Sequence, residues 1–291
     1  MYPPGGVLRR SRMSNTTTMT WLITGCSSGF GASLARAALE IGDKVVATAR
    51  RIEDLGSLAA IPGASVLPLD VTNTQQVKHV LNQAKDEHGR LDVIVNNAGA
   101  GLLGALEDCS RDDVDACMAV NFYGPLAVMQ AAAPIFRSQH GGHMINISAA
   151  AAIANYPGFS IYGAAKAALE AASESYRAEL SPCGVKVTLV QPGPYRTEFI
   201  GRSMRRASTS TSAYDRTVGQ FGTLLERMNG KQPGDPDKAA SAIVRMVSEG
   251  RAPLRLVLGA YALKKGRDTA AARLRELDDF AHLGTGTEFG T

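Results

Sequence analysis

The residues best suited to chemistry in this chain are a tyrosine and a lysine four positions apart. Tyr162 and Lys166, in the run YGAAK, fall on one face of a helix if the segment is helical. A free phenol has a pKa of about 10, but a nearby ammonium favours the phenolate and lowers that pKa. Such a pair can hold and release a proton at the tyrosine oxygen, although by itself it is equally typical of an exposed helix face.

A glycine-rich loop precedes this pair by more than a hundred residues. Residues 24–31 (TGCSSGFG) follow a short apolar run and lead directly into a segment with helical periodicity. Gly25 permits a sharp turn, Gly29 lets the backbone approach a pyrophosphate, and Gly31 allows close packing of helix on strand. The helix N-terminus then offers unpaired N–H groups to phosphates. Strand, loop and helix in this order indicate a dinucleotide-binding loop; the alternative is a glycine-rich turn without a ligand.

The end of the second predicted strand bears on which dinucleotide is bound. NAD-specific folds usually have an acid there, which binds the ribose 2′-hydroxyl and repels a 2′-phosphate. In this chain Ala49 occupies that position, and Arg50 and Arg51 follow it. Guanidinium groups bind phosphate bidentately. The sequence therefore predicts NADP(H) in preference to NAD(H), with Arg50 as the first candidate for the 2′-phosphate and Arg51 as the alternative.

Four motifs in order give the chain a family resemblance. They are the TGxxxGxG loop, the run NNAG at 96–99 after the fourth predicted strand, YxxxK at 162–166, and Pro192-Gly193 after the sixth strand. Each is weak alone. Together, from Thr20 to about Leu258, they make the chain similar to the short-chain dehydrogenase/reductase family, and specifically to its NADP(H)-preferring carbonyl reductases and alcohol dehydrogenases.

The resemblance implies roles for single residues. Tyr162 would be the general acid in reduction and the general base in oxidation, and Lys166 would also bind the nicotinamide ribose. Asn121 matches a helix-kinking asparagine that holds a water in the proton relay. Asp70 with Val71 would face the adenine, and Asn97 would lie near the adenosine ribose. The implied cofactor contacts are Gly25, Ser27, Ser28, Gly29, Phe30, Gly31, Arg50, Arg51, Asp70, Val71, Asn97, Ala98, Gly99, Tyr162, Lys166, Pro192, Gly193 and Thr197, the last through the carboxamide.

One position departs from the family pattern. The catalytic serine usually lies thirteen residues before the tyrosine, where this chain has Ala149, and Ser148 is one residue earlier. Adjacent strand residues point to opposite faces, so Ser148 can serve only if the strand end bulges or turns. Three readings stay open: Ser148 acts through a shifted loop, the chain is a Ser-to-Ala variant of an active enzyme, or it binds the dinucleotide without efficient turnover.

The substrate is expected to be a small molecule. The predicted wall is apolar or aromatic, which suits a ketone, an aldehyde or a secondary alcohol of moderate size better than a sugar. Its residues are Leu102, Tyr156, Phe159, Tyr195 and Phe199. An alternative from another class is a dinucleotide-sensing regulatory protein on the same fold, which only Ala149 makes credible.

The elements that must position these residues follow an alternating pattern. Short β-branched runs alternate with longer helical stretches, which is typical of an α/β protein with one doubly wound, Rossmann-type domain and a seven-stranded parallel sheet. The predicted strands lie near 21–23, 45–47, 65–67, 93–95, 144–146, 186–189 and 254–257. The predicted helices cover 32–41, 75–88, 125–138, 162–180 and 236–248.

Residues 20–291 are expected to form this domain, after a disordered extension at 1–19. A flap is predicted at about 194–234; its part from Arg202 to Gly234 is rich in Ser, Thr, Arg and Gly and lacks a predicted strand. Its Arg202, Arg205 and Arg206 are interpreted as a solvated face, with an acidic substrate as the alternative.

Composition excludes other classes of function. The net charge of +4 comes without a dense basic block, so no nucleic-acid partner is expected. The four cysteines form no CxxC pair and the five histidines are interpreted as surface or capping residues, so no metal site is expected. No apolar run suggests a membrane span, and a cytoplasmic protein is predicted.

Two segments suggest contacts with a second subunit. The helix after Tyr162 has a small-residue face, Ala164, Ala165, Ala168 and Ala172, and family members often assemble there, so a homodimer or homotetramer is expected. Burial of that face against the chain's own sheet is the alternative. The segment at about 260–283 reads as an amphipathic helix that covers either the substrate pocket or a partner subunit.

Overall fold

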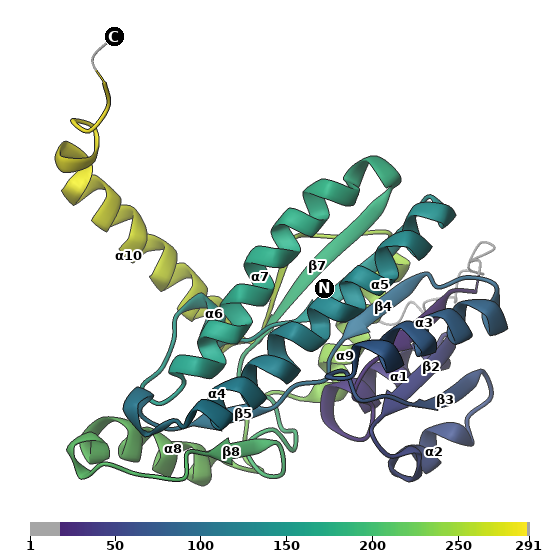
Figure 1. Cartoon of the computed structure of the whole chain (residues 1–291), viewed down its shortest axis with the longest axis horizontal. Helices are drawn as coiled ribbons and strands as arrows, with labels where there is room; N and C mark the ends of the chain where they lie inside the picture. Colours follow the sequence, from purple (N-terminus) through teal and green to yellow (C-terminus); the bar gives the residue numbers. More distant parts are fainter. Residues whose placement is uncertain (1–17, 290–291) are drawn as a thin grey trace, which may run out of the picture.

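A seven-stranded, entirely parallel sheet forms the centre of the computed structural model, which describes residues 18–289 (Figure 1). Its strand order is β3-β2-β1-β4-β6-β7-β9. The bounds are β1 Thr20–Ile23, β2 Lys44–Ala49, β3 Ala64–Pro68, β4 Val93–Asn96, β6 Gly142–Ile147, β7 Val185–Pro192 and β9 Arg255–Leu258. The predicted fold class is confirmed, and all seven predicted strands are present in this sheet.

Helices cover both faces of the sheet. The helices α1, Gly29–Glu40, and α9, Pro236–Ser248, pack together on one face. The helices α3, Thr74–His88, α5, Gly124–Gln139, and α7, Ser160–Leu180, cover the other. The remaining helices are α2 Gly56–Ala59, α4 Arg111–Met118, α6 Ala150–Ile153, α8 Gln220–Met228 and α10 Ala260–Gly284.

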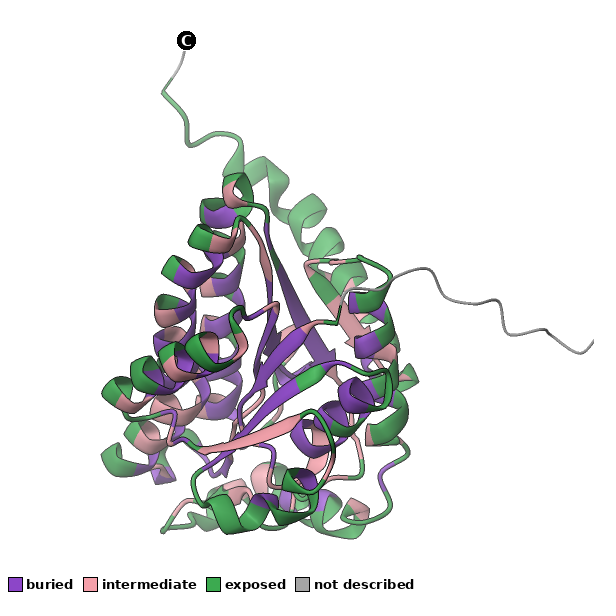
Figure 2. Cartoon of the chain, turned by 90° about the vertical axis from the view of Figure 1, so that its right-hand side faces the viewer, coloured by how far each residue is buried: buried purple, intermediate pink, exposed green. Residues whose placement is uncertain are grey.

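Alternation along the central strands builds two hydrophobic cores. In β1, Trp21 and Ile23 contribute to the core under α1 and α9, whereas Leu22 contributes to the core under α3, α5 and α7. Parallel strands are buried on both faces, which is why they read as continuous apolar runs. The sheet is the buried centre of Figure 2 and the helices form its partly exposed cover.

The strand order sets where a ligand can bind. The chain runs outward from β1 to β2 and β3, then returns to β4 on the other side of β1. Loops after β1 and β4 therefore leave the sheet toward opposite faces and open a crevice at the carboxyl ends of these strands. The glycine-rich loop and the NNAG run are the two loops at this point.

The flap contains a strand, contrary to the sequence prediction. Strand β8, Met204–Arg206, pairs in parallel with β5, Gly101–Leu103, and α8 follows it. The prediction was wrong because a strand of three residues is too short to show an alternating sequence pattern. The strand forms because β5 lies alongside it. Of the flap arginines, Arg206 pairs with Glu226 at 2.6 Å, and Arg205 lies 3.8 Å from Asp113.

The predicted extension at 1–19 lies mostly outside the described residues. Met19, which is described, packs against the core under α1, and its N–H donates to Asp43 Oδ1 at 2.9 Å. The indole N–H of Trp21 donates to the other oxygen of Asp43 at 2.8 Å. Met19 therefore belongs to the packed part of the chain.

One helical stretch, 111–139, is long and apolar enough to cross a membrane by length and composition alone. It consists of α4, a π-helical turn and α5. In the structure several of its apolar residues, among them Val128, Met129 and Phe136, are buried in the protein core. Core packing thus accounts for this part of its composition.

His143 corrects the interpretation of the histidines. It is buried in β6, with its Nε2 2.9 Å from Thr188 Oγ1. Burial, with smaller effects from Lys186 and Arg177, lowers its pKa to about 4. His140 does cap a helix, since it adopts φ +52° at the end of α5. The four cysteines are free thiols.

The buried neutral His143 should make stability depend on pH. Its pKa is lower in the folded chain than the ordinary 6.5, so below pH 6.5 only the unfolded chain gains this proton. We expect the free energy of unfolding to fall by about 3 kcal/mol from this residue between pH 6.5 and 4. Denaturant titrations of the wild type and of His143→Gln at several pH values give the free energy of unfolding. The slope of this free energy against pH should be smaller in the variant. His140→Asn, which tolerates the same φ, should keep the wild-type slope; an identical slope in His143→Gln would contradict the assignment.

Candidate active site

The glycine-rich loop forms a cradle that side chains would fill. Gly25 adopts φ +73°, and a Cβ there would lie 2.9 Å from the Ala98 Cα. A Cβ on Gly31 would overlap the Gly25 carbonyl and lie 2.5 Å from Asn97 Nδ2. The loop is thus closed against the end of β4, with backbone as its inner surface. This geometry fits the phosphates of a dinucleotide, which need close approach of backbone N–H groups.

Asn97 and Thr24 hold the two loops of the crevice together. The Thr24 hydroxyl oxygen accepts from the N–H groups of Asn97 and Ala98, each at 3.0 Å. In return Asn97 Nδ2 donates to the carbonyls of Thr24 and Gly25, at 2.8 and 3.0 Å. The bracing role implied for Asn97 has its counterpart in these contacts between the ends of β1 and β4.

The N-terminus of α1 is free of competing anions. Ser28 is its N-cap, but the Ser28 side chain makes no capping bond, and no acid lies in the first turn. From the flap, Arg202 Nη2 donates to Ser28 Oγ at 3.2 Å and lies 3.5 Å from Ser27 Oγ. A guanidinium therefore lies against the two hydroxyls of the loop. Sequence reasoning missed this role, because only the fold of the flap brings residue 202 to residue 28.

The two arginines after β2 differ in their surroundings. Arg51 forms an exposed ion pair with Asp54 at 2.9 Å. Arg50 is exposed and has no hydrogen bond or ion pair with any described residue. Of the two arginines, Arg50 is the one whose guanidinium can bind an anion without giving up a partner.

Asp70, which is expected to face the adenine, accepts from the backbone N–H and the hydroxyl of Thr72, while Val71 beside it is buried.

Tyr162 and Lys166 are both buried on the side of α7 that faces the sheet. Lys166 Nζ donates to the Ile147 carbonyl at the end of β6, at 2.9 Å. Burial lowers the pKa of Lys166 to about 8. Burial also raises the pKa of Tyr162, with a smaller effect of Cys117, so the lowering expected from the sequence is not found. Desolvation disfavours the phenolate.

Asn121 lies in a π-helical turn, Ala119–Tyr123, which joins α4 to α5. Its Nδ2 donates to the carbonyls of Ala100 and Cys117, at 2.8 and 2.9 Å, and its Oδ1 accepts from Ala100 N–H at 3.3 Å. A Cβ on Gly99 would lie 3.1 Å from Asn121 Oδ1 and 3.5 Å from Lys166 Nζ. The structure thus brings Asn121 and Lys166 to the same loop, and π-turns are frequent at functional sites.

Ser148 and Ala149 point to different sides of the strand end. Ser148 N–H still bonds Val190, and Ala149 is extended at φ −159° and ψ 160°, so no bulge or turn reverses the alternation. The Ser148 hydroxyl donates to Glu170 Oε1 at 2.5 Å, two helical turns beyond Tyr162 on α7. Ala149 instead packs in the cluster that contains Tyr162. The shifted loop that Ser148 would need is therefore not present in the structure.

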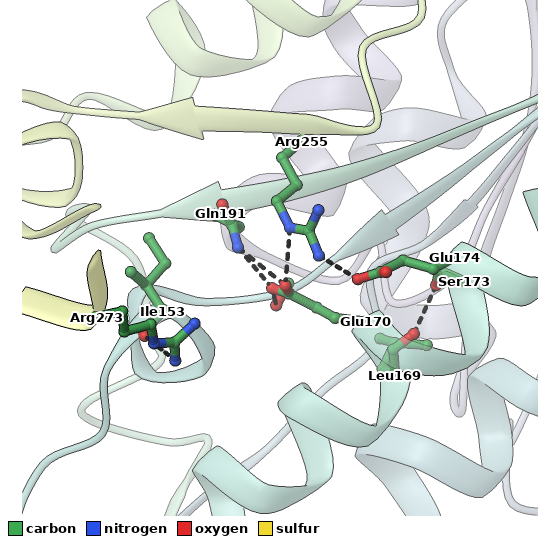
Figure 3. Close-up of polar contacts among 9 residues, drawn as sticks. Ile153, Leu169, Glu170, Ser173, Glu174, Gln191, Arg255 and Arg273 are labelled. Atoms are coloured by element: carbon green, nitrogen blue, oxygen red, sulfur yellow. Dashed lines mark hydrogen bonds and ion pairs between the residues drawn. The ribbon is translucent and has the colours of Figure 1, made fainter. Parts of the chain in front are cut away.

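Glu170 is a buried acid that the sequence prediction overlooked (Figure 3). Besides the Ser148 hydroxyl, it accepts from Gln191 Nε2 at 2.8 and 3.0 Å. Arg255 of β9 lies 3.5 Å away and also pairs with Glu174, one turn further along α7. The charge of Glu170 acts against the burial effect on Lys166 and raises its pKa. Glu170 therefore helps to keep the lysine protonated.

Most of the predicted substrate wall lies around Tyr162. The Phe159 and Phe199 rings each lie 5.3 Å from its ring, and Leu102 is buried in the same cluster. Tyr156 stacks on Phe221 of α8 at 5.2 Å, which sequence reasoning did not include. The flap thus covers the site through an aromatic cluster.

Tyr195 and its neighbours take a different place. The Tyr195 ring packs on Phe30 of the glycine-rich loop at 5.0 Å, so it lies at the cofactor side and not in the cluster around Tyr162. Gly193 N–H donates to Leu258 at 3.0 Å, just beyond Pro192 at the end of β7. A Cβ on Gly29 would lie 3.1 Å from Thr197 Cβ, so Thr197 also borders the loop.

Removal of the Glu170 charge should destabilise the fold. Glu170→Gln removes the buried anion that accepts from Gln191 and pairs with Arg255, and we expect a loss of about 1–3 kcal/mol in the free energy of unfolding. Glu174→Gln is the matched control, because its ion pair with Arg255 is half-exposed and worth less than about 1 kcal/mol. Chemical denaturation measures both. Equal losses in the two variants would show that the buried network stabilises the fold no more than the half-exposed ion pair does.

Comparisons with known proteins agree with this geometry. The family model described as short chain dehydrogenase matches residues 19–207. A curated relative, the oxidoreductase BOA17 of Botryotinia fuckeliana, is 37% identical over 250 residues, which cover 85% of this chain and 91% of the relative.

Two solved structures are also similar. A short-chain dehydrogenase from Streptomyces avermitilis is 36% identical, with a TM-score of 0.86 over 93% of this chain and 100% of that one. A short chain dehydrogenase from Burkholderia cenocepacia, solved in complex with NADP, is 28% identical, with a TM-score of 0.71 over 90% of this chain and 97% of that one. With the crevice between β1 and β4 and the residues that line it, these similarities establish that the chain belongs to the short chain dehydrogenase family of oxidoreductases.

Proposed function

We propose that this protein is an NADP(H)-dependent oxidoreductase that interconverts a ketone or aldehyde and a secondary alcohol of moderate, largely apolar character. The observation that supports it most is that Asn121 and Lys166 meet at the Gly99 loop after β4, with Tyr162 one turn before Lys166 on α7. Such a set has little purpose without proton transfer. The apolar cluster around Tyr162 supports the substrate class.

The residues of the chain supply the proton and the orientation. When bound, the nicotinamide would supply or accept the hydride. The Tyr162 hydroxyl would donate its proton to the carbonyl oxygen in reduction and take it back in oxidation. Lys166, held on the Ile147 carbonyl, would bind the nicotinamide ribose and favour the phenolate once the proton has left.

Ala149 would limit the rate. It lies at the family's serine position and packs beside Tyr162 without a hydroxyl, so the carbonyl oxygen would lack one hydrogen-bond donor. Loss of one such donor costs about 2.7–4 kcal/mol in transition-state stabilisation. This favours an enzyme of reduced rate. The second candidate, a dinucleotide-binding sensor without efficient turnover, rests on the same missing hydroxyl.

Restoring the hydroxyl should raise the rate of carbonyl reduction. We expect Ala149→Ser to increase kcat/KM about a hundredfold or more, because the new hydroxyl would stabilise the developing oxyanion. NADPH oxidation with a panel of aromatic ketones, β-keto esters and aldehydes measures it. Tyr162→Phe should abolish the gain, and Ser148→Ala should leave it. If every form binds NADPH and none turns over, the sensor replaces the enzyme as the function.

NADP(H) is the proposed cofactor in preference to NAD(H). Arg50 supports it, since its guanidinium has no competing partner among the described residues and no acid occupies position 49. Arg202 would bind the pyrophosphate, because it already lies on Ser27 and Ser28 at the N-terminus of α1. The NADP complex of the Burkholderia cenocepacia relative supports the same cofactor class.

The two arginines should have separable effects on cofactor binding. Arg50→Ala should raise the Kd for NADPH about tenfold or more and leave that for NADH unchanged, because only NADPH has the 2′-phosphate. Arg202→Ala should raise both Kd values by similar factors, since both cofactors contain the pyrophosphate. Isothermal titration calorimetry measures these values. Arg51→Ala is the control, with little expected change; if it alone were selective for NADPH, Arg51 would be the 2′-phosphate residue.

A homo-oligomer is part of the proposal. Ala164 of the α7 small-residue face is exposed, and Ala168 and Ala172 are half-buried, whereas Ala165 is buried within the subunit. Most of this face is therefore free to pack on a second copy.

A further inference from the structure

The C-terminal helix α10 leaves the body of the protein after about four turns (Figure 1). Near its start, Ala262 is buried, the Tyr261 hydroxyl lies 3.0 Å from that of Tyr156, and Lys265 Nζ lies 3.7 Å from the centre of the Tyr156 ring. Its last contact with the body is the bond from Arg273 to the Ile153 carbonyl, at 3.4 Å (Figure 3). From residue 274 to 284 every residue is exposed, so this part packs on no other described element (Figure 2).

Helix α10 has an apolar stripe along its length. Leu263, Ala270, Leu274, Leu277 and Ala281 recur at helical spacing and share one face. Leu274 is 61% and Leu277 68% exposed, and Phe280 beside them is 62% exposed. Large apolar side chains grouped in this way on a projecting helix indicate a contact with a partner.

The charges of α10 indicate which partner. Up to residue 275 the helix has five basic residues and one acid, Lys264, Lys265, Arg267, Arg273, Arg275 and Asp268. Beyond that point it has three acids, Glu276, Asp278 and Asp279, and no lysine or arginine. An antiparallel helix with the same charges would place its acidic end against the basic part of this helix, and its basic part against the acidic end. We propose that α10 pairs antiparallel with the α10 of a second copy of this chain, across a two-fold axis near residues 271 and 272.

This register also matches the side chains in size. It places Leu277 opposite Gly266 of the second copy and Phe280 opposite Leu263, with Ala270 opposite Arg273 in the layer between them. Leu277 thus faces a glycine, which lets the helices approach closely at that layer. Arg267 and Asp278 are eleven residues apart, or about three turns, and lie on the same edge of the stripe. Each would therefore meet the other residue of the second copy, in two symmetric ion pairs.

The surface is distinct from the small-residue face of α7, and the contact does not depend on the proposed reaction. A two-fold pair is isologous, so each helix buries the same patch and satisfies the same charges. The helix pair is short, so its interface lies at the small end of specific contacts, and the pairing should depend on protein concentration.

Sedimentation velocity of the full chain over a range of concentrations tests the proposal. Leu274→Glu with Leu277→Glu should halve the assembled mass, or raise the dissociation constant at least tenfold. Leu224→Glu is the matched control, since Leu224 is a leucine of similar exposure, 55%, on α8. It should behave like the wild type. If the Leu274/Leu277 variant assembled like the control, the proposal would be overturned.

Charge reversal separates specific pairing from a general loss of helix. Arg267→Glu and Asp278→Lys should each weaken assembly, because each places like charges opposite one another. The two together should restore the wild-type dissociation constant to within about threefold, because the pairs are then re-formed with reversed sign. Failure of this rescue would contradict the register. Binding of the wild type to vesicles of anionic lipid, lost in the leucine variant while its mass stays that of the wild type, would identify a membrane surface as the occupant and reject the dimer.

Discussion

The structure depends on the bonds that close the loops after β1 and β4 against each other. Four hydrogen bonds link Thr24 and Gly25 to Asn97 and Ala98 across the point where the strand order reverses. These bonds use the polar groups that the two loops would otherwise leave unpaired as they diverge. What is left facing outward is the backbone of the glycine-rich loop and the N-terminus of α1. The cofactor crevice is therefore a consequence of how the sheet ends, and not a separate feature added to it.

A second constraint is the burial of charge along α7. Lys166 and Glu170 are one turn apart, both buried and both held by groups at the ends of β6 and β7. Burial lowers the pKa of the lysine, and Cys117 and Glu170 oppose that effect. The same acid holds the Ser148 hydroxyl away from Tyr162. The network that contains Lys166 and Glu170 thus also binds the Ser148 hydroxyl. Ser148 therefore does not replace the hydroxyl that Ala149 lacks.

Two outer segments, the flap and the start of α10, contact residues of the site. The flap contributes Phe199 and Phe221 to the aromatic cluster over Tyr162 and brings Arg202 to the glycine-rich loop. The first turns of α10 hold Tyr156 through its hydroxyl and its ring. The flap therefore touches both the cofactor side and the substrate side of the site. Helix α10 continues from the substrate wall to the proposed subunit contact.

By itself the sequence determined the fold and the motif residues of the site. Strands such as 93–96 are apolar on both faces, and the spacing of Tyr162 and Lys166 fixes their common helix face, so local patterns sufficed. Tertiary structure alone decided the rest. Strand β8 exists only because β5 lies beside it, and Arg202 reaches Ser28 across 174 positions. Likewise Tyr195 belongs with Phe30, His143 is buried, and Glu170 is ionically paired inside the protein. Such contacts join residues distant in the chain, and no local period encodes which distant groups will desolvate or neutralise one another.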